Sequence, residues 1–460
     1  MSEDELKKKM LGQTTCSSKD YIPGDIDGDG VLSEREILQL FYVFTNGPEW
    51  GGDFLMHWEN LNTKTCDMPG VSCNGDGEVI AITPNNAKLC NCRSGSSRCH
   101  GLPSELGLLK SLQIIGLSGA SKLKGTLPSE LGTLENLNVL KLDKCLSLTG
   151  SIPSEFGNMK SLKILDLSNS GVTGKLPSEL GQLSALTTLN LSLNSFSGSI
   201  PSTITELKSL KQLVLSRCKL NGRIPENIQN LHQLENLELY GNNLTGPIPN
   251  NLSGLTSLKR LDVFSNKLTS TLPVEIGLLK NLQIIHIKEN SLSGSLPPEI
   301  ASLPSLTWFD ASSNNITGMI DHAYGMSSSL VDLKLGGNKI HGPIPVSLCS
   351  AKKLHEGAAS KYGCDAVLCP LGTYSTAGYA TPTSECKPCP SGESSLHLGA
   401  SSCVPISQRE ILAMFFDVMG GDSWDEDKRS GWKVLPNECE WSGVSCDSNG
   451  ELNGLAFQLR

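Results

Sequence analysis

One pattern of leucines recurs along most of this 460-residue chain. It has the form LxxLxLxxN, and its first leucine returns at intervals of 25 residues twice and then of 24 residues seven times. A fixed period of this length indicates short units that cannot bury a core alone and must stack on one another. An irregular unit with Ile80, Ile82 and Asn85 precedes the regular ones. The regular units begin at Leu112, Leu137, Leu162, Leu186, Leu210, Leu234, Leu258, Leu282, Leu306 and Leu330.

Within each unit, apolar and polar residues alternate as in a short strand with one face in a core. In Leu261-Asp262-Val263 the two apolar side chains are expected to be buried, while Asp262 faces solvent. The residue at the N position is expected to turn the chain while buried, since asparagine can bond neighbouring backbone groups. Two units carry Cys145 and Cys218 there, which we interpret as buried free thiols. The asparagines are Asn194, Asn242, Asn266, Asn290, Asn314 and Asn338.

Each unit continues into a GxΦP segment in which Φ is usually isoleucine or leucine, as in Gly150-Ser-Ile-Pro153. The consensus LxGxIPxxLGxLxxL resembles plant-type leucine-rich repeats, such as those of receptor-like kinase ectodomains and polygalacturonase-inhibiting proteins. The resemblance covers roughly residues 33–348. It implies an α/β solenoid, a right-handed superhelix with a parallel sheet on its concave face and a second short strand from the GxIP segment. It says less about the ligand, because one fold can serve many functions.

A helix-start signal precedes the array. Ser33-Glu-Arg-Glu36, followed by apolar residues at helical spacing, predicts a capping box that opens an amphipathic helix. Residues 33–79 resemble the N-terminal cap of plant-type repeat proteins, which implies a disulfide between Cys66 and Cys73. The segment recurs near the end of the chain, where Cys439-Glu-Trp-Ser-Gly-Val-Ser-Cys446 matches the first copy. A second cap without an array indicates a fragment of a longer protein with at least two arrays.

A cysteine-rich segment lies between the array and the second cap. It resembles the small ephrin-receptor-like modules of extracellular proteins, and so short a stretch needs crosslinks to hold a core. Zinc is an alternative, but Cys386-Lys-Pro-Cys389 has no second CxxC or HxxxH to complete a site. Among the connectivities that the sequence allows, we favour Cys369–Cys386, Cys389–Cys403 and Cys349–Cys364. The segment is interpreted as a stapled spacer between solenoids.

Twelve residues before and within the first cap match the calcium loop of an EF-hand. The second cap keeps the serine and glutamate of the capping box but lacks the alternating aspartates, so helix capping alone does not explain them. Pro23-Gly24 stands where an entering helix would end, and no second loop is present, so a dockerin-like half-motif is expected. The alternative is a solvated acidic turn. The predicted calcium ligands are Asp25, Asp27, Asp29, the backbone of Val31, Ser33 and Glu36.

In plant-type leucine-rich-repeat proteins, which this chain resembles, the outward-facing positions of the concave strands are the usual contact surface. Aromatic side chains gather there beside arginine and carboxylates, which indicates a recognition patch. Scattered surface aromatics are the alternative, because single exposed rings are common. The predicted ligand-binding residues are Tyr240, Arg260, Asp262, Phe264, His286, Lys288, Trp308 and Asp310.

Composition narrows the function classes. A formal net charge of −9 gives no basic footprint for nucleic acid, and no apolar run is long enough to span a membrane. The first ten residues lack the apolar stretch of a signal peptide, whereas the cysteine clusters indicate an extracellular or cell-surface protein. No GxSxG, HExxH, P-loop or kinase signature occurs, so we expect no enzyme. Four N-glycosylation sequons begin at Asn190, Asn243, Asn251 and Asn315.

The sequence thus predicts a non-catalytic recognition module for a protein, peptide or glycan ligand, with calcium as a possible structural ion. An inhibitor of secreted hydrolases and an intracellular scaffold are the alternatives. The expected divisions are an extension (1–24), a calcium loop (25–36), a first cap (33–79), an array (80–348), a cysteine-rich module (349–403) and a second cap (404–460).

Overall fold

A computed structural model describes most of the repeat array and parts of the segments around it. The chain divides into two compact units, Met1–Asn290 and Ser291–Arg460, and each is described by itself. Among the described residues, no helix is long and apolar enough to cross a membrane. The described residues are 31–45, 57–58, 63–84, 101–349, 363–381, 384–390, 393–395, 397–405, 407, 412, 416, 439, 441, 444–446 and 452–455.

The first unit opens with helix α2 (Glu34–Phe44), which begins at Ser33 as the capping box predicts. Its apolar face is buried, and the Trp58 ring stacks on Tyr42 with centroids 6.1 Å apart. Gln39 Nε2 donates a hydrogen bond of 2.7 Å to the Trp58 carbonyl, which ties the helix to the tryptophan segment of this cap.

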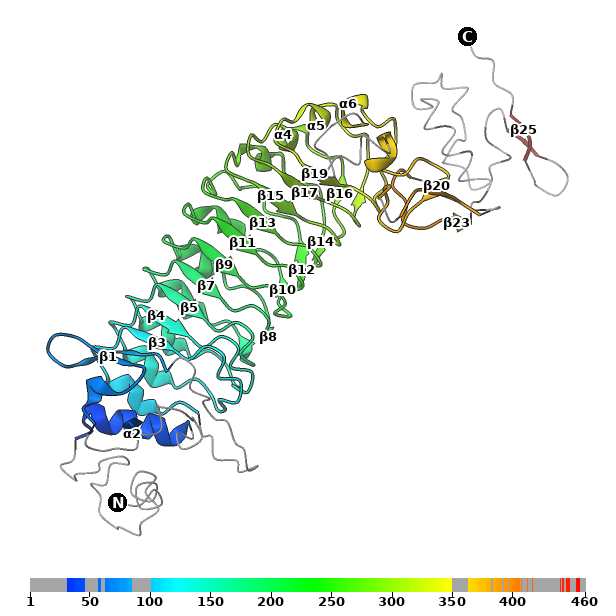
Figure 1. Cartoon of the computed structure of the whole chain (residues 1–460). Coiled ribbons are helices and arrows are strands. Elements are labelled where there is room, and N and C mark those ends of the chain that lie inside the picture. Colours follow the sequence, from blue (N-terminus) through cyan, green and yellow to red (C-terminus); the bar gives the residue numbers. More distant parts are fainter. Residues whose placement is uncertain are drawn as a thin grey trace. The chain divides into compact units, whose positions relative to one another are not determined.

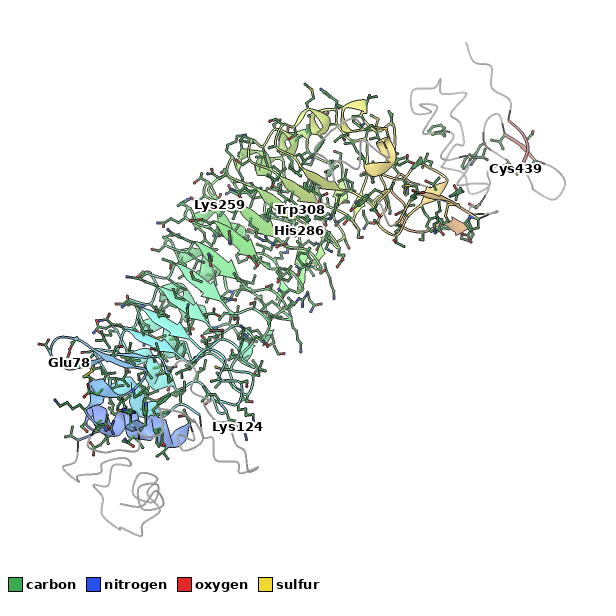
Figure 2. All side chains as sticks on the ribbon, in the orientation of Figure 1. Glu78, Lys124, Lys259, His286, Trp308 and Cys439 are labelled. Atoms are coloured by element: carbon green, nitrogen blue, oxygen red, sulfur yellow. A yellow bond between two sulfur atoms is a disulfide. The ribbon has the colours of Figure 1, made fainter. Side chains whose placement is uncertain are left out.

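A hairpin of β1 (Val71–Cys73) and β2 (Val79–Ile82) follows, tied by the expected disulfide between Cys66 and Cys73. Glu78, labelled in Figure 2, lies in its turn, where Asn74 donates both a backbone and a side-chain hydrogen bond to it. The hairpin therefore covers the start of the array with paired backbone and a crosslink.

Beyond the hairpin, the strands of the first unit lie side by side in chain order and pair in parallel, as Figure 1 shows. The middle residue of each strand points into the core, and Leu237 pairs in register with Leu213 and Leu261. The predicted parallel sheet is confirmed. Its strands are β3 (Ile114–Gly116), β4 (Val139–Lys141), β5 (Ile164–Asp166), β7 (Thr188–Asn190), β9 (Gln212–Val214), β11 (Asn236–Glu238), β13 (Arg260–Asp262) and β15 (Ile284–His286).

A second set of strands forms at or shortly before the start of the segments that end in ΦP. They are β6 (Thr173–Lys175) with β8 (Ser195–Ser197), and β10 (Asn221–Gly222) with β12 (Asn243–Gly246) and β14 (Lys267–Leu268).

The proline of most GxΦP segments stands at the N-cap, directly before a 3₁₀ helix, where its fixed φ fits the extended backbone and its missing N–H costs no helical bond. In the first unit these helices are η3 (Ser104–Leu108), η4 (Ser129–Thr133), η5 (Ser154–Asn158), η6 (Ser178–Gln182), η7 (Ser202–Glu206), η8 (Glu226–Asn230) and η9 (Val274–Leu278), whereas η2 (Thr65–Asp67) belongs to the cap.

The asparagines at the N position are buried or half-buried and bond the backbone on both sides, as predicted. Asn242 Nδ2 donates to the carbonyls of Leu215 and Leu239 at 2.8 Å each, and its Oδ1 accepts from the amides of Cys218 and Leu220. The Cys218 thiol donates to the Leu191 carbonyl at 3.2 Å, which partly replaces an asparagine. Cys145 and Cys218 are free, buried thiols, as expected.

The second unit continues the same pattern. β17 (Trp308–Asp310) and β19 (Asp332–Lys334) pair in parallel, as do β16 (Ser293–Gly294) and β18 (Asn315–Ile316). Single-turn α helices take the place of most 3₁₀ helices. They are α4 (Pro298–Ala301), α5 (Ala323–Met326) and α6 (Val346–Cys349).

The cysteine-rich segment is built from η11 (Gly363–Ala366) and two small hairpins. β20 (Thr373–Tyr374) pairs with β21 (Lys387–Pro388), and β22 (Glu393–Ser394) pairs with β23 (Val404–Pro405). Three disulfides crosslink it, in the connectivity favoured from the sequence: Cys349–Cys364, Cys369–Cys386 and Cys389–Cys403.

The last described strands repeat the first cap. β24 (Val444–Cys446) and β25 (Leu452–Leu455) form an antiparallel pair with a register shift between Ser445 and Cys446. The β1–β2 hairpin has the same shift between Ser72 and Cys73. A disulfide joins Cys439 to Cys446 with the same seven-residue separation as in the first cap.

Candidate ligand-binding face

Tyr240 and Phe264 occupy equivalent places two residues after β11 and β13. Their rings are half-buried and stack almost in parallel, with centroids 4.4 Å apart and an interplanar angle of 6°. The backbone of neighbouring repeats runs in register, so equivalent side chains meet along the sheet. The sequence placed both rings in the binding patch, and the structure brings them into contact.

Cations lie over the outer sides of this stack. The Arg217 guanidinium is 5.9 Å from the centre of the Tyr240 ring, and the Lys288 ammonium is 5.4 Å from that of Phe264. The His286 ring meets Phe264 edge-on at 5.5 Å. Each cation–π contact of an exposed group contributes about 0.5–1 kcal/mol. Arg217 was missed by the sequence analysis, although it directly follows Ser216, the equivalent of Tyr240 in the preceding repeat.

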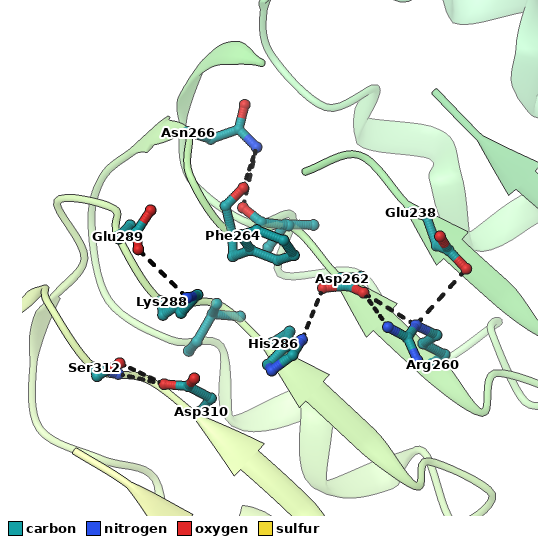
Figure 3. A network of polar contacts seen from close by, with 12 residues as sticks. Glu238, Arg260, Asp262, Phe264, Asn266, His286, Lys288, Glu289, Asp310 and Ser312 are labelled. Atoms are coloured by element: carbon teal, nitrogen blue, oxygen red, sulfur yellow. Dashed lines mark hydrogen bonds and ion pairs between the residues drawn. The ribbon is translucent and has the colours of Figure 1, made fainter. Parts of the chain in front are cut away.

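A charged network lies beside Phe264, with its side chains on β11, β13 and β15 (Figure 3). Arg260 donates from Nε and Nη2 to Asp262 Oδ2 at 3.0 and 2.6 Å, and its Nε lies 3.7 Å from Glu238 Oε1. On the other side of Asp262, His286 Nδ1 is 3.2 Å from Oδ1. This last pair has the distance of an ion pair but not the angles of a hydrogen bond.

Asp262 corrects one expectation. The alternating pattern placed its side chain in solvent, yet it is fully buried. Arg260 and His286 lie on either side of it, and the buried carboxylate is tolerated because the Arg260 charge and its two hydrogen bonds compensate the lost hydration. Asp262 therefore holds Arg260 and His286 in place rather than reaching a ligand itself.

Glu238, which the sequence analysis did not include in the binding site, is also part of the network. Burial raises the pKa of its carboxyl, the nearby Arg260 charge opposes that rise, and Asp262 adds to it. Lys288 lies 3.4 Å from Glu289, whose pKa is lowered chiefly by a hydrogen bond from the Ser265 hydroxyl. The face thus offers aromatic edges bordered by cations, each tied to a carboxylate or a ring.

In the second unit, Trp308 of β17 is partly exposed, and the Lys334 ammonium lies 4.6 Å from its ring centre. Asp310 is buried, and its Oδ1 accepts from the amide and the hydroxyl of Ser312. Lys334 is a further residue that the sequence analysis did not assign to the patch.

The predicted calcium ligands are only partly described. Asp25, Asp27 and Asp29 lie outside the described residues, whereas Val31 is exposed. Glu36 Oε2 accepts from the Ser33 amide at 2.8 Å and from its hydroxyl at 2.7 Å, as a capping box requires. In the described ranges, no group of three or more His, Cys, Asp or Glu side chains is arranged for a metal ion. Calcium binding stays a prediction.

Comparison with known families agrees with the fold. Residues 137–271 match the leucine-rich repeat region family, and residues 281–303 match the leucine-rich repeat family. The leucine-rich repeat N-terminal domain matches twice, at residues 32–74 and 406–447. No curated protein sequence matches the chain.

Solved structures are similar over larger parts of the chain. A TDR receptor is 34% identical over 55% of this chain and 48% of its own, with a TM-score of 0.50. The PEPR1–AtPEP1 structure is 28% identical over 65% and 48%, also with a TM-score of 0.50. A plant ice-binding protein is 25% identical over 68% and 96%, with a TM-score of 0.53. The chain spans about half the length of the first two. It is built of leucine-rich repeats and carries two leucine-rich-repeat N-terminal domains.

Proposed function

We propose that the chain is a receptor-like, non-catalytic recognition module whose sheet face binds a peptide or protein ligand. The observation that carries the proposal is the Tyr240–Phe264 stack beside Arg260 and Lys288. These rings stand on the solvent side of the sheet, so the repeat core does not need them. Their mutual stacking fixes their rotamers before any ligand arrives, which lowers the entropy lost on binding.

The ring environment favours a peptide or protein over a glycan. Sugar rings are commonly held against an open aromatic face. Here the faces of Tyr240 and Phe264 are turned toward each other and toward Arg217 and Lys288. Ring edges and flanking cations remain for apolar and acidic side chains. The likeness to a TDR receptor and to PEPR1–AtPEP1 supports a receptor-type role.

An extracellular location is part of the proposal. It is supported by disulfides in both caps and in the cysteine-rich segment, since such crosslinks persist in oxidising compartments.

The binding proposal can be tested by selecting peptides from a displayed random library against the immobilised chain. The Tyr240→Ser/Phe264→Ser variant should bind the selected peptides at least about tenfold more weakly. The control is Lys141→Ala/Thr188→Ala, which alters the same sheet face on β4 and β7 and should bind normally. Unchanged binding by the aromatic variant, with an unchanged circular dichroism spectrum, would show that the ligand site lies elsewhere.

We also propose that Asp25, Asp27 and Asp29 form a calcium loop that stabilises the first cap. The support is the spacing of the aspartates, which helix capping does not require. Calcium should raise the melting temperature of the wild type, and Asp25→Ala should abolish that rise. Asp76→Ala, an exposed aspartate in the β1–β2 turn, is the control and should keep it. An equal rise in the Asp25 variant would exclude the loop as the binding site.

A further inference from the structure

The last repeat of the array is buried although no further repeat follows it. Leu333 and Leu335 are 0% exposed and Ile340 is 1% exposed, values typical of repeats inside the array. A terminal repeat of a solenoid exposes one side of its core unless another element covers it. Something other than a leucine-rich repeat therefore closes this end.

Two backbone hydrogen bonds join the last repeat to the cysteine-rich segment. The Gly337 amide donates to the Gly399 carbonyl at 2.8 Å, and the Leu398 amide donates to the Ile340 carbonyl at 3.1 Å. The disulfide between Cys349 and Cys364 adds a covalent link from the end of α6 to η11. The segment is thus docked on the repeat.

The bond to Gly399 continues a series that runs between repeats. Ser313 donates to the Gly336 carbonyl at 2.8 Å, and Gly337 donates in the same way to Gly399. In the first unit, the Arg217 amide does the same to the Tyr240 carbonyl.

The bond from Leu398 continues a second series. Lys339 donates to the Ile316 carbonyl at 2.8 Å, and Leu398 donates to Ile340, the equivalent of Ile316 one repeat later. The dipeptide Leu398-Gly399 therefore supplies both partners that a next repeat would supply.

Glycines make this close approach possible. A Cβ on Gly378 would lie 2.5 Å from the Gly399 carbonyl oxygen and 2.6 Å from Gly336 Cα. A Cβ on Gly336 would lie 2.5 Å from the Ala377 carbonyl oxygen. Gly336 is the equivalent, in the last repeat, of Tyr240 and Phe264 in earlier repeats. The cysteine-rich segment therefore occupies space that a side chain fills in those repeats.

Tyr379 gives a further sign of this contact. Burial raises the pKa of its phenol to about 12, with smaller contributions from Asp332 and Asp310 on the sheet. Its neighbours in sequence, Ala377 and Gly378, are the residues that meet Gly336.

We propose that the cysteine-rich segment, residues 363–405, is the C-terminal cap of the array, with Leu398-Gly399 replacing the backbone of a missing repeat. This role differs from that of a spacer, because a spacer needs no fixed contact with the repeat. It also closes the first array before the second match to an N-terminal domain begins at residue 406.

The test uses two variants of the full chain with matched backbone strain. Gly378 and Gly372 both have a φ of +77°, but only Gly378 faces the repeat, and nothing lies within 4 Å of a Cβ on Gly372. Hydrogen exchange of residues 330–342 should become about tenfold faster in Gly378→Ala and stay unchanged in Gly372→Ala. Equal exchange in both variants would overturn the proposal.

A measurement on the unaltered protein guards against misfolding of the variants. The Gly337 amide should exchange as slowly as that of Ser313, because both make the same hydrogen bond. Exchange of Gly337 at the rate of an open loop would show that the segment is a spacer and not a cap.

Discussion

The rings of Tyr240 and Phe264 lie face to face, 4.4 Å apart, although 24 residues of a complete repeat separate them in the chain. A double-mutant cycle with Tyr240→Ala and Phe264→Ala should give a coupling energy of about 0.5–1.5 kcal/mol in denaturant unfolding. Each single variant already removes the contact between the rings, so the double variant should lose less stability than the sum of the two single losses. Additive single effects would show that the rings do not interact in solution.

The Arg260–Asp262 pair should matter far more to stability than an exposed pair of equal length. The nitrogen–oxygen distance is 2.6 Å both there and between Lys259 and Glu235, but only Asp262 is fully buried. Arg260→Ala leaves a buried carboxylate with weaker compensation and should lower the free energy of unfolding by about 3 kcal/mol.

Lys259→Ala is the matched control and should change the free energy of unfolding by less than about 0.5 kcal/mol. Urea unfolding of both variants provides the comparison. Equal losses would mean that burial of Asp262 does not decide the value of the pair.

The two free thiols should be unreactive in the folded protein. Burial raises the pKa of Cys145 to about 12 and that of Cys218 to about 11, so little thiolate exists at pH 8. Iodoacetamide should modify neither in native protein and both after unfolding without reductant, as read by mass spectrometry. Because the folded pKa values exceed that of an unfolded thiol, these groups should destabilise the fold only as the pH rises above about 9. Modification of native protein at pH 8 would contradict this.

His397 should make the cysteine-rich segment sensitive to acid. Burial, followed by the nearby charges of Lys339 and His341, lowers its pKa from the usual 6.5. The folded protein therefore binds a proton at His397 less readily than the unfolded chain does. Stability that is fully present above pH 6.5 is lost as the pH falls from 6.5 toward the lower pKa of the folded state. The melting temperature should therefore drop in mild acid, and His397→Gln should reduce the drop. The control His232→Gln changes an exposed histidine in the first unit and should leave it unaltered.

The four sequons should differ in whether they carry a glycan. Asn243, Asn251 and Asn315 are exposed. Asn190 is half-buried on the sheet, where its Oδ1 accepts hydrogen bonds from Ser192. Expression through a secretory host should place glycans on the three exposed sites and leave Asn190 bare, as site mapping by mass spectrometry would reveal. A glycan on Asn190 would show that this part of the face is open to the transferase.

The repeat fold could be predicted from the sequence because each unit contains the residues that determine its own strand, turn and helical turn. The leucine alternation predicts the strand, the GxΦP proline begins the helical turn and the buried asparagine bonds the backbone, as Asn242 does. These interactions join a unit to its immediate neighbour, so a pattern repeated at a fixed interval is sufficient to predict them. The cap helix followed in the same way from Ser33 and Glu36.

The candidate site was only partly predictable. The sequence located Tyr240, Phe264 and Arg260, since outward strand positions follow from the register. It did not show that Asp262 is buried, because that depends on how Arg260 and His286 fold over it. Arg217 was missed for a similar reason, as its guanidinium reaches back over the next repeat's ring.

By itself, the sequence determined the repeat, its strands, its buried thiols and the helix of the first cap, because these rest on contacts within one unit or between adjacent units. Only the tertiary structure decided what the cysteine-rich segment does. The contacts of Gly336 with Gly378 and of Gly337 with Gly399 join backbone to backbone, and they leave no side-chain pattern from which a sequence could predict them.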